Sequence, residues 1–441
     1  MRCWLIALFV LAFGQASFAK DARPPNIVII LADDLGYGDL GVYGQTQIKT
    51  PNIDKMARQG VRLTDFYAAA NICTPSRAGL LTGRYPIRTT LGHEVIQAKD
   101  TNGLPQSEIT LAEALKAKGY ATGIVGKWHL GHTAPFWPPR AHGFDYYFGV
   151  PYSNDMKPLS LFTDRQEGVD IIKDGTVDLA KLTAQFTQKA VSFIDEHQDK
   201  PFMLYLAHTA PHMPLVPNIP FKGRSAAHAY GDVVEEIDAS VGLVMDALKR
   251  NGLDKNTLVI FTSDNGPWFE GDSGGLHDRK GGGGFDGGYR VPFIARFPGA
   301  IPAGKTSGGI AMGIDIFPTV LAYAGITPPN DREIDGKDIR SIFQGGSASP
   351  HPYLLLFNNE EIAAIRTQRW KMVVRANYRT YDVPLAMVGY SPLFDMVSDR
   401  QERFAANQSA PEVVNQLRDI LAAERKKFEP LRTRPPTKLP F

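Results

Sequence analysis

The stretch NIVIILADD, residues 26–34, decides the fold class because an unbroken apolar run ends in two acidic residues. A short run of this kind is typical of a strand that is buried on both faces of a sheet. Three other apolar runs, at residues 121–125, 202–206 and 258–262, also end in polar side chains. The polar residues after the four runs are Asp33 and Asp34, Lys127 and His129, His208 and His212, and Asp264 and Asn265. Because ligands of open α/β sheets bind beyond the carboxyl ends of the strands, we expect one site where these ends meet.

Helical patterns separate the apolar runs. Residues 108–118 form the first candidate helix, with Ser107 as the expected N-cap and Gly119 as the stop signal. Two longer candidates carry apolar side chains on one face. These side chains are Leu179, Leu182, Phe186 and Phe193 in one helix, and Val234, Ile237, Val241, Val244 and Leu248 in the other, which should end near Gly252. The alternation of strands and helices predicts an α/β fold with a large mixed sheet between two layers of helices.

The pattern changes after residue 345, where Gly345, Gly346, Ser347 and Pro350 resemble a linker. Short strands at 353–357, 363–367 and 371–375 then follow without intervening helices, and a helix is expected from Pro411 to about Phe428. We therefore predict a main domain at residues 20–345 and a smaller antiparallel sheet with one helix at residues 346–441.

The N-terminus has the features of a secretory signal peptide. Arg2 precedes an apolar stretch at residues 4–13, and Ser17 and Ala19 are small residues of the type that signal peptidase recognises. We expect cleavage after Ala19 and export to the periplasm or the extracellular space. An uncleaved membrane anchor is the alternative, but the stretch is shorter than the roughly 20 residues that cross a bilayer. The mature chain should contain no membrane span.

Charge and cysteine content narrow the possible functions. A formal net charge of +2 on 441 residues, without a basic stripe, argues against nucleic acid as a partner. The chain has two cysteines, and Cys3 would leave with the signal peptide. Cys73 would then be a lone thiol in an oxidising compartment, where a free cysteine needs a functional reason.

The segment CTPSR, residues 73–77, places this cysteine in a helix that Gly83 can end. Proline is favoured in the first helical turn, so Cys73 should lie at the helix N-terminus. Free N–H groups there attract a sulfate or a phosphate, and Arg77 adds a cation one turn along. A buried cysteine that acts only as a small apolar residue is the alternative interpretation.

Four residues at two strand ends have the chemistry of a metal site. Asp33, Asp34, Asp264 and Asn265 carry the short oxygen-bearing side chains that a hard divalent cation prefers. Turn formation or helix capping would explain either pair alone. Ligand type does not distinguish calcium from magnesium.

Taken together, these segments resemble the type I sulfatases, which depend on formylglycine. CTPSR resembles their signature, and the supporting stretches are ADDLGYGD at 32–39, GKWHLG at 126–131, APHMP at 210–214, SDNGP at 263–267, and Lys280-Gly281 with GGYRVP at 287–292. The resemblance runs from Asn26 to about Ala405 and points to the branch of arylsulfatase A and N-acetylgalactosamine-6-sulfatase. It implies an alkaline-phosphatase-like fold.

The resemblance also implies the cofactors and the roles of the site residues. A maturation enzyme would oxidise Cys73 to Cα-formylglycine, whose gem-diol attacks sulfur and forms a covalent sulfo-enzyme intermediate. One calcium ion would be held by Asp33, Asp34, Asp264, Asn265 and the modified Cys73. Arg77, Lys127 and Lys280 would hold the anion, Asp264 would help to deprotonate the nucleophile, and His129 and His212 would transfer protons. His208 is left out of this set because the family pattern places the histidine in APHMP.

The function that we expect is hydrolysis of sulfate monoesters, on a small molecule or an oligosaccharide and preferably of a carbohydrate. Two alternatives remain open. One is a formylglycine-dependent phosphodiesterase or phosphonate monoester hydrolase, and the other is a catalytically silent protein that binds sulfated glycans.

Overall fold

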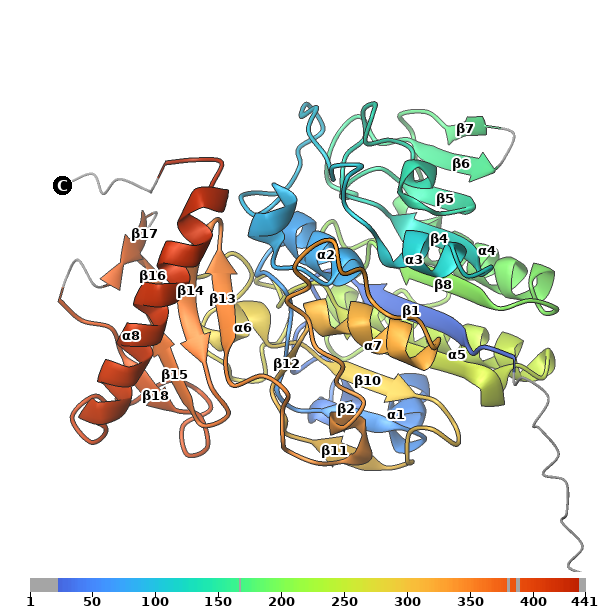
Figure 1. Ribbon diagram of the computed structural model, residues 1–441. Helices are drawn as coiled ribbons and strands as arrows, with labels where there is room; N and C mark the ends of the chain where they lie inside the picture. Colours follow the sequence, from blue (N-terminus) through green and yellow to red (C-terminus); the bar gives the residue numbers. More distant parts are fainter. Residues whose placement is uncertain (1–22, 166–167, 379–380, 386–388, 436–441) are drawn as a thin grey trace, which may run out of the picture.

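The computed structural model describes residues 23–165, 168–378, 381–385 and 389–435, so the expected signal peptide lies outside the described residues. In the described chain, ten strands form one mixed sheet in the order β11-β2-β10-β9-β1-β8-β4-β5-β6-β7 (Figure 1). The strands are β11 (Lys305–Ser307), β2 (Val61–Leu63), β10 (Phe293–Arg296), β9 (Thr257–Ser263), β1 (Asn26–Ala32), β8 (Phe202–Ala207), β4 (Ala121–Lys127), β5 (Tyr146–Val150), β6 (Leu161–Arg165) and β7 (Gly168–Lys173). The five strands from β9 to β5 run parallel, whereas β10 and β6 run antiparallel to their inner neighbours. The predicted mixed sheet is confirmed.

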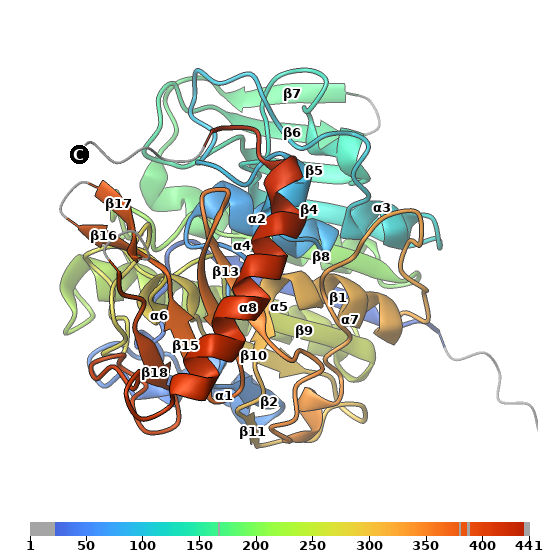
Figure 2. The same ribbon diagram turned by 60° about the vertical axis from the view of Figure 1, so that its left-hand side comes forward.

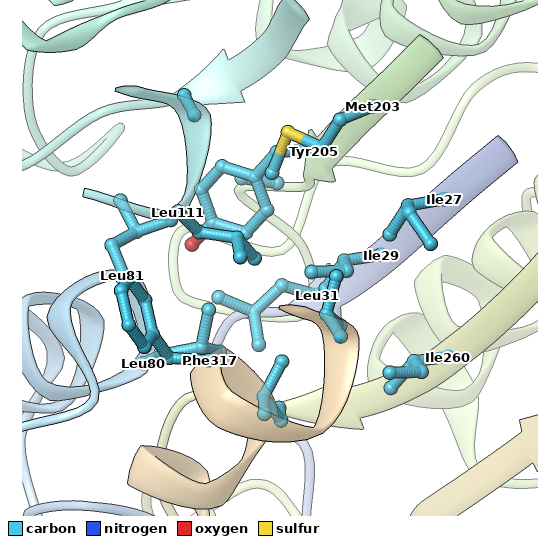
Figure 3. Close-up of a cluster of buried hydrophobic side chains, with 14 of the residues drawn as sticks. Ile27, Ile29, Leu31, Leu80, Leu81, Leu111, Met203, Tyr205, Ile260 and Phe317 are labelled. Atoms are coloured by element: carbon cyan, nitrogen blue, oxygen red, sulfur yellow. The ribbon is translucent and has the colours of Figure 1, made fainter. Parts of the chain in front are cut away.

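Helices cover both faces of this sheet, as predicted. Because side chains alternate along a strand, Ile27 and Ile29 of β1 enter one apolar core and Val28 and Ile30 enter the other. The first core includes side chains of α2 (Cys73–Thr82), α3 (Leu111–Lys116) and α7 (Ile316–Tyr323). Figure 3 shows Leu80, Leu111 and Phe317 of these helices facing the strand side chains. The second core includes side chains of α1 (Pro51–Arg58), α4 (Leu182–Glu196) and α5 (His228–Arg250).

The first predicted helix begins later than expected. Its N-cap is Thr110, not Ser107, because Thr110 Oγ1 accepts a hydrogen bond from Glu113 N at 3.1 Å and Glu113 Oε2 accepts one from Thr110 N at 2.7 Å. This reciprocal pair satisfies two backbone donors that a helix start otherwise leaves free. Glu108 instead forms an ion pair with Arg84 at 2.6 Å. The expected helix around Leu179 also starts later, since Leu179 belongs to a 3-10 turn (Leu179–Lys181) before α4.

The C-terminal part forms a second, antiparallel sheet, which confirms the prediction. Its strands are β13 (Leu354–Asn358), β14 (Glu361–Arg366), β15 (Trp370–Val373) and β18 (Leu393–Asp395), and α8 (Pro411–Phe428) lies across it in Figure 2. The predicted strand at 371–375 is divided, because β15 ends at Val373 and Arg375 begins a hairpin of β16 (Arg375–Tyr378) and β17 (Tyr381–Pro384). The remaining strands of the described chain are the pair β3 (Phe66–Tyr67) and β12 (Ala311–Met312), and its remaining α-helix is α6 (Asp286–Tyr289).

A buried ionic cluster joins the small sheet to α6 of the main domain. Lys371 of β15 contacts Asp286 of α6 at 2.6 Å and Glu402 at 2.7 Å. None of these three residues is more than 2% exposed, so the small sheet is fixed against the segment that follows the glycine run at 281–284. Within the described residues, no helix has the length and the apolar composition for a bilayer crossing.

Candidate active site

The carboxyl ends of β1, β4 and β9 bring charged side chains to one edge of the main sheet. Backbone hydrogen bonds hold the ends together: Asp264 N donates to Ala32 O at 3.1 Å, and Asp33 N donates to Ala210 O at 3.0 Å. Asp33, Lys127 and Asp264 are each at most 1% exposed. The expected meeting of strand ends therefore creates a compact, water-poor group of charges.

Three carboxylates and a cysteine form the centre of this group. One oxygen each of Asp33, Asp34 and Asp264 and the sulfur of Cys73 all lie within 4.8 Å of one another. Asp34 has a φ of +66°, a backbone conformation that costs energy for a residue with a side chain. Strain of this kind is typical of residues that are held for a function.

These residues fit a hard divalent cation. Asn265 lies beside the carboxylates, and its Nδ2 donates to Asp34 Oδ1 at 2.8 Å. Its Oδ1 is buried and has no hydrogen-bond partner among the described residues. A buried acceptor without a donor is costly, and a cation would satisfy it together with the carboxylate oxygens. The donor set of oxygens matches calcium or magnesium chemistry.

Cys73 is the first residue of α2, as expected from CTPSR. The N-cap residue, Ile72, has no side chain that could satisfy the free N–H groups of the first turn. Cys73 Sγ lies 3.5 Å from Asp33 Oδ1. Burial, with a smaller contribution from the charges of Asp33 and Asp264, raises the pKa of the thiol, although Lys127 and Lys280 oppose this shift. The thiol stays protonated near neutral pH, so unmodified Cys73 is a poor nucleophile.

Three cations surround the carboxylates. Arg77 of α2 contacts Asp264 at 2.8 Å and Asp33 at 3.6 Å, and Lys127 Nζ lies 2.6 Å from Asp33 Oδ2. Lys280 approaches from the opposite loop, 2.8 Å from Asp34 Oδ2. The positive charges that could hold an anion are thus all in place around Cys73.

Neighbouring charges separate the titration of two buried acids. Burial opposes ionisation of Asp33, but Lys127 and Arg77 outweigh it and hold the pKa of this carboxyl well below its usual range. Burial and the negative charge of Asp33 raise the pKa of Asp264 to about 6, against the influence of Arg77. Asp33 is therefore a fixed anion, whereas Asp264 exchanges a proton more readily.

His129 is a buried neutral imidazole. Its Nε2 lies 2.9 Å from Ile96 O, so this nitrogen must carry the hydrogen, because a carbonyl only accepts. Its Nδ1 is buried and without a hydrogen-bond partner among the described residues, and it carries the free lone pair. Burial and the charges of Lys127 and Arg77 lower the pKa of His129 well below the usual value. The ring is therefore neutral near neutral pH, and its Nδ1 lone pair is free to accept a hydrogen bond or a proton from a group bound in the cluster.

His212 lies on the solvent side of the cluster. Its Nδ1 donates to Met213 O at 2.6 Å, which leaves Nε2 directed toward Asp34 Oδ2 at 3.6 Å. His212, Lys280 and Asp34 line a cleft of about 510 Å³, whereas Lys127 and His129 are fully buried behind it. The part of a substrate that enters the cleft therefore meets His212 and Lys280.

His208 does not join this site. It is fully buried at the end of β8, and its Nε2 contacts Ser240 Oγ of α5 at 3.1 Å. Burial lowers the pKa of His208 to about 4, so it packs as a neutral residue under the helix layer.

Two further residues, Ser153 and Thr74, support the cluster, and a third, Asn154, lines the cleft beside it; none of them was predicted. Ser153 Oγ accepts a hydrogen bond from Lys127 Nζ at 3.2 Å, and Asn154 lines the cleft. Thr74 Oγ1 donates to His129 O at 3.0 Å and so holds the backbone of that histidine. Ser153 and Asn154 follow β5, the fifth parallel strand. A predicted strand at 146–150 would have added them to the polar residues at strand ends.

Comparisons with known proteins agree with this geometry. A family model described as Sulfatase matches residues 25–326, and one described as N-sulphoglucosamine sulphohydrolase, C-terminal, matches residues 283–427. N-acetylgalactosamine-6-sulfatase of Canis lupus familiaris is 39% identical over 393 residues, which cover 83% of this chain and 75% of the relative. Arylsulfatase A of Bos taurus is 40% identical over 396 residues, which cover 83% and 78%.

Two solved structures are similar over nearly the whole chain. The PsFucS1 sulfatase of Pseudoalteromonas sp. has a TM-score of 0.84 and 28% identity, with 92% of this chain and 91% of that chain covered. Ps i-CgsB in complex with k-i-k-neocarrahexaose has a TM-score of 0.77 and 29% identity, with 92% and 93% covered.

Proposed function

Because the chain belongs to the sulfatase family, we propose that it hydrolyses sulfate monoesters of carbohydrates at the cluster around Cys73. The observation that carries this proposal is the pairing of an anion-binding helix start with three cations, Arg77, Lys127 and Lys280. A sulfate monoester carries a negative charge that repels a nucleophile, so a site that hydrolyses it must neutralise this charge first.

Two further groups would complete the proposed chemistry. When bound, a calcium ion held by Asp33, Asp34, Asp264 and Asn265 would neutralise charge, and a Cα-formylglycine made from Cys73 by a maturation enzyme would supply the attacking oxygen. The unpartnered Asn265 Oδ1 supports the first assignment, and the raised pKa of the Cys73 thiol supports the second, since the thiol alone is a weak nucleophile.

The protein's own side chains have different roles according to how deeply they are buried. Lys127 and Arg77 hold sulfuryl oxygens at the buried side of the cluster, and Lys280 holds them at the cleft side. Asp264, with a pKa near 6, and the free Nδ1 of His129 can each take a proton there. His212 lies where the organic part of the substrate must enter. In its protonated form, with Nδ1–H bonded to Met213 O and Nε2–H beside the Asp34 carboxylate, it can give the Nε2 proton to the departing alcohol.

The other two functions are less well supported. The named relatives are sulfatases, which argues against a phosphodiesterase or phosphonate monoester hydrolase. A silent glycan-binding protein would not need buried acids, bases and cations in one cluster. We further propose that residues 1–19 direct export to the periplasm or the extracellular space, and that residues 20–345 carry the chemistry while residues 346–441 support it.

Release of sulfate tests the proposal. The protein should be produced with a formylglycine-generating enzyme and incubated with 4-nitrophenyl sulfate and with galactose, N-acetylgalactosamine and glucosamine sulfates of defined position. Matched phosphate and phosphonate esters serve as controls. We expect sulfate release to exceed phosphate release. Faster turnover of the phosphorus esters would support the first alternative, and binding of sulfated sugars without any release would support the second.

A further inference from the structure

The cleft above the cluster has two walls that the proposed chemistry does not use. Trp268 follows β9, and Asn154 follows β5. In the sheet order these strands are the two ends of the parallel block, with β1, β8 and β4 between them. Trp268 and Asn154 both line the cleft and come from loops that follow the two outer strands of the parallel block.

Trp268 is an exposed aromatic side chain on a fixed support. It is 43% exposed, and its ring meets that of Phe269 edge-on with centroids 4.7 Å apart. Arg279 Nη1 donates to Trp268 O at 3.0 Å and to Gly271 O at 2.9 Å. The next residue, Lys280, donates its backbone N–H to Pro267 O at 3.0 Å. These hydrogen bonds tie the backbone of Trp268 to the segment that carries Lys280.

Asn154 is fixed to the other side of the anion site. The preceding residue, Ser153, accepts a hydrogen bond from Lys127, which places Asn154 one residue away from that cation. Asn154 is only 5% exposed, and its Oδ1 has no hydrogen-bond partner among the described residues. A buried amide oxygen without a donor is unfavourable until a ligand supplies one.

We propose that Trp268 and Asn154 determine the preference of this cleft for a sugar ester: Trp268 stacks on the apolar face of one pyranose ring, and Asn154 Oδ1 accepts a hydrogen bond from a ring hydroxyl. This inference rests on the proposed function and specifies its substrate. A pyranose has a face of C–H groups and an edge of hydroxyl donors, which matches an exposed indole and an unpartnered acceptor. The cleft volume of about 510 Å³ is within the range of small-ligand sites.

An aryl sulfate matches only half of this cleft. Its ring would stack on Trp268, but it has no hydroxyl for Asn154. Since a site built to bond a hydroxyl discriminates against analogues that lack one, Asn154 should affect sugar esters selectively. The ratio of kcat/KM for a sugar sulfate to that for 4-nitrophenyl sulfate is therefore the quantity to measure. Misfolding or a disturbed catalytic cluster would lower both values and leave the ratio unchanged.

The first experiment compares Asn154→Ala with the unchanged protein, using N-acetylgalactosamine 6-sulfate, galactose 6-sulfate and 4-nitrophenyl sulfate. We expect kcat/KM for the best sugar ester to fall about 10- to 100-fold, the effect of losing one buried hydrogen bond, and that for the aryl ester to change less than about threefold. An equal fall on both esters, or no fall on either, would overturn the assignment of Asn154.

The second experiment tests whether Trp268 acts through its ring. Trp268→Ala and Trp268→Leu should each lose about 10-fold in kcat/KM on the sugar ester, whereas Trp268→Phe should retain most of the rate because it keeps an aromatic face. Phe404→Ala is the matched control, since Phe404 is 76% exposed and does not line the cleft. Full activity of Trp268→Leu would contradict stacking.

Assays of the unchanged protein distinguish a failure of the sugar subsite from a failure of the sulfatase function. Release of sulfate from the aryl ester but from none of the sugar esters would reject the sugar subsite and leave the sulfatase function intact. Release from neither class would reject the proposed function itself.

Discussion

Asp33, Arg77 and Lys127, which we call the floor of the site, are completely buried, whereas His212, Trp268 and Lys280, which we call its rim, are reached by solvent. On the floor, Asp33 lies 2.6 Å from Lys127 Nζ and 3.6 Å from Arg77 Nη2. Asp33 and Lys127 are at strand ends, and Arg77 is in α2. On the rim, the side chains come from loops, and Trp268 is nearly half exposed. The difference indicates that the floor determines the reaction and the rim determines which ester is accepted.

Removal of the metal should have the largest effect, because it disturbs the floor directly. We expect excess chelator to lower turnover at least about 10³-fold and added calcium to restore it, since a bound cation contributes several kcal/mol of charge stabilisation. Asp33→Ala and Asp264→Ala should resist rescue by calcium, whereas Asp195→Ala, at a surface pair with Arg250, should behave like the unchanged protein. Full turnover by metal-stripped protein in chelator would contradict the assignment of the floor.

Arg77→Ala should have the next largest effect, and on stability as well as on rate. It leaves Asp264 and Asp33 buried without this partner, which typically costs about 3–5 kcal/mol in free energy of unfolding. The control is Arg250→Ala, which removes a half-exposed surface pair and should cost less than about 1 kcal/mol. Chemical denaturation in the presence of chelator measures the free energy of unfolding of both variants. If the two variants lost equal free energy of unfolding, the buried pairs of the floor would be no more important for stability than a surface pair.

His212→Ala tests the rim. With a sugar sulfate, whose alkoxide is a poor leaving group, we expect a loss of about 10²-fold, because a general acid contributes at least this much. With 4-nitrophenyl sulfate the loss should be less than about 10-fold, since the phenolate leaves without a proton. A Brønsted series of aryl sulfates measures this dependence. Equal losses across the series would show that His212 does not protonate the leaving group.

His208 sharpens the comparison, because it is as buried as the floor but has no counter-charge. Its pKa of about 4 lies below the unfolded value, so the unfolded state binds more protons as the pH falls from about 6.5 to 4. Stability from this residue is present above that window and is lost within it. We expect His208 to contribute about 2 kcal/mol to the change in the free energy of unfolding between pH 7 and pH 5, so His208→Gln should show a drop that is smaller by about this amount. The same pH dependence in both proteins would contradict a neutral His208.

The floor and two residues of the rim, His212 and Lys280, could be predicted from the sequence, whereas Trp268 and the cleft residue Asn154 could not. The runs before Asp33 and Asp264 are unbroken and apolar because β1 and β9 are covered on both faces, so their ends are visible in the sequence. β5, by contrast, has the short sequence YYFGV, which a glycine interrupts, and Ser153 and Asn154 were missed with it. The exposure of Trp268 depends on Arg279 and Phe269, which are contacts between loops that leave no periodic pattern.

Cys73 is the residue on which the account depends most directly. Its place at the start of α2, its buried thiol and the surrounding cations are explained if the active protein carries an aldehyde at position 73. Mass spectrometry of the tryptic peptide that contains residue 73, from a preparation with measured sulfate release, is the decisive measurement. We predict a peptide about 18 Da lighter than the thiol form, in proportion to activity, and none in Cys73→Ala. A fully active preparation in which position 73 is only a thiol would contradict the account.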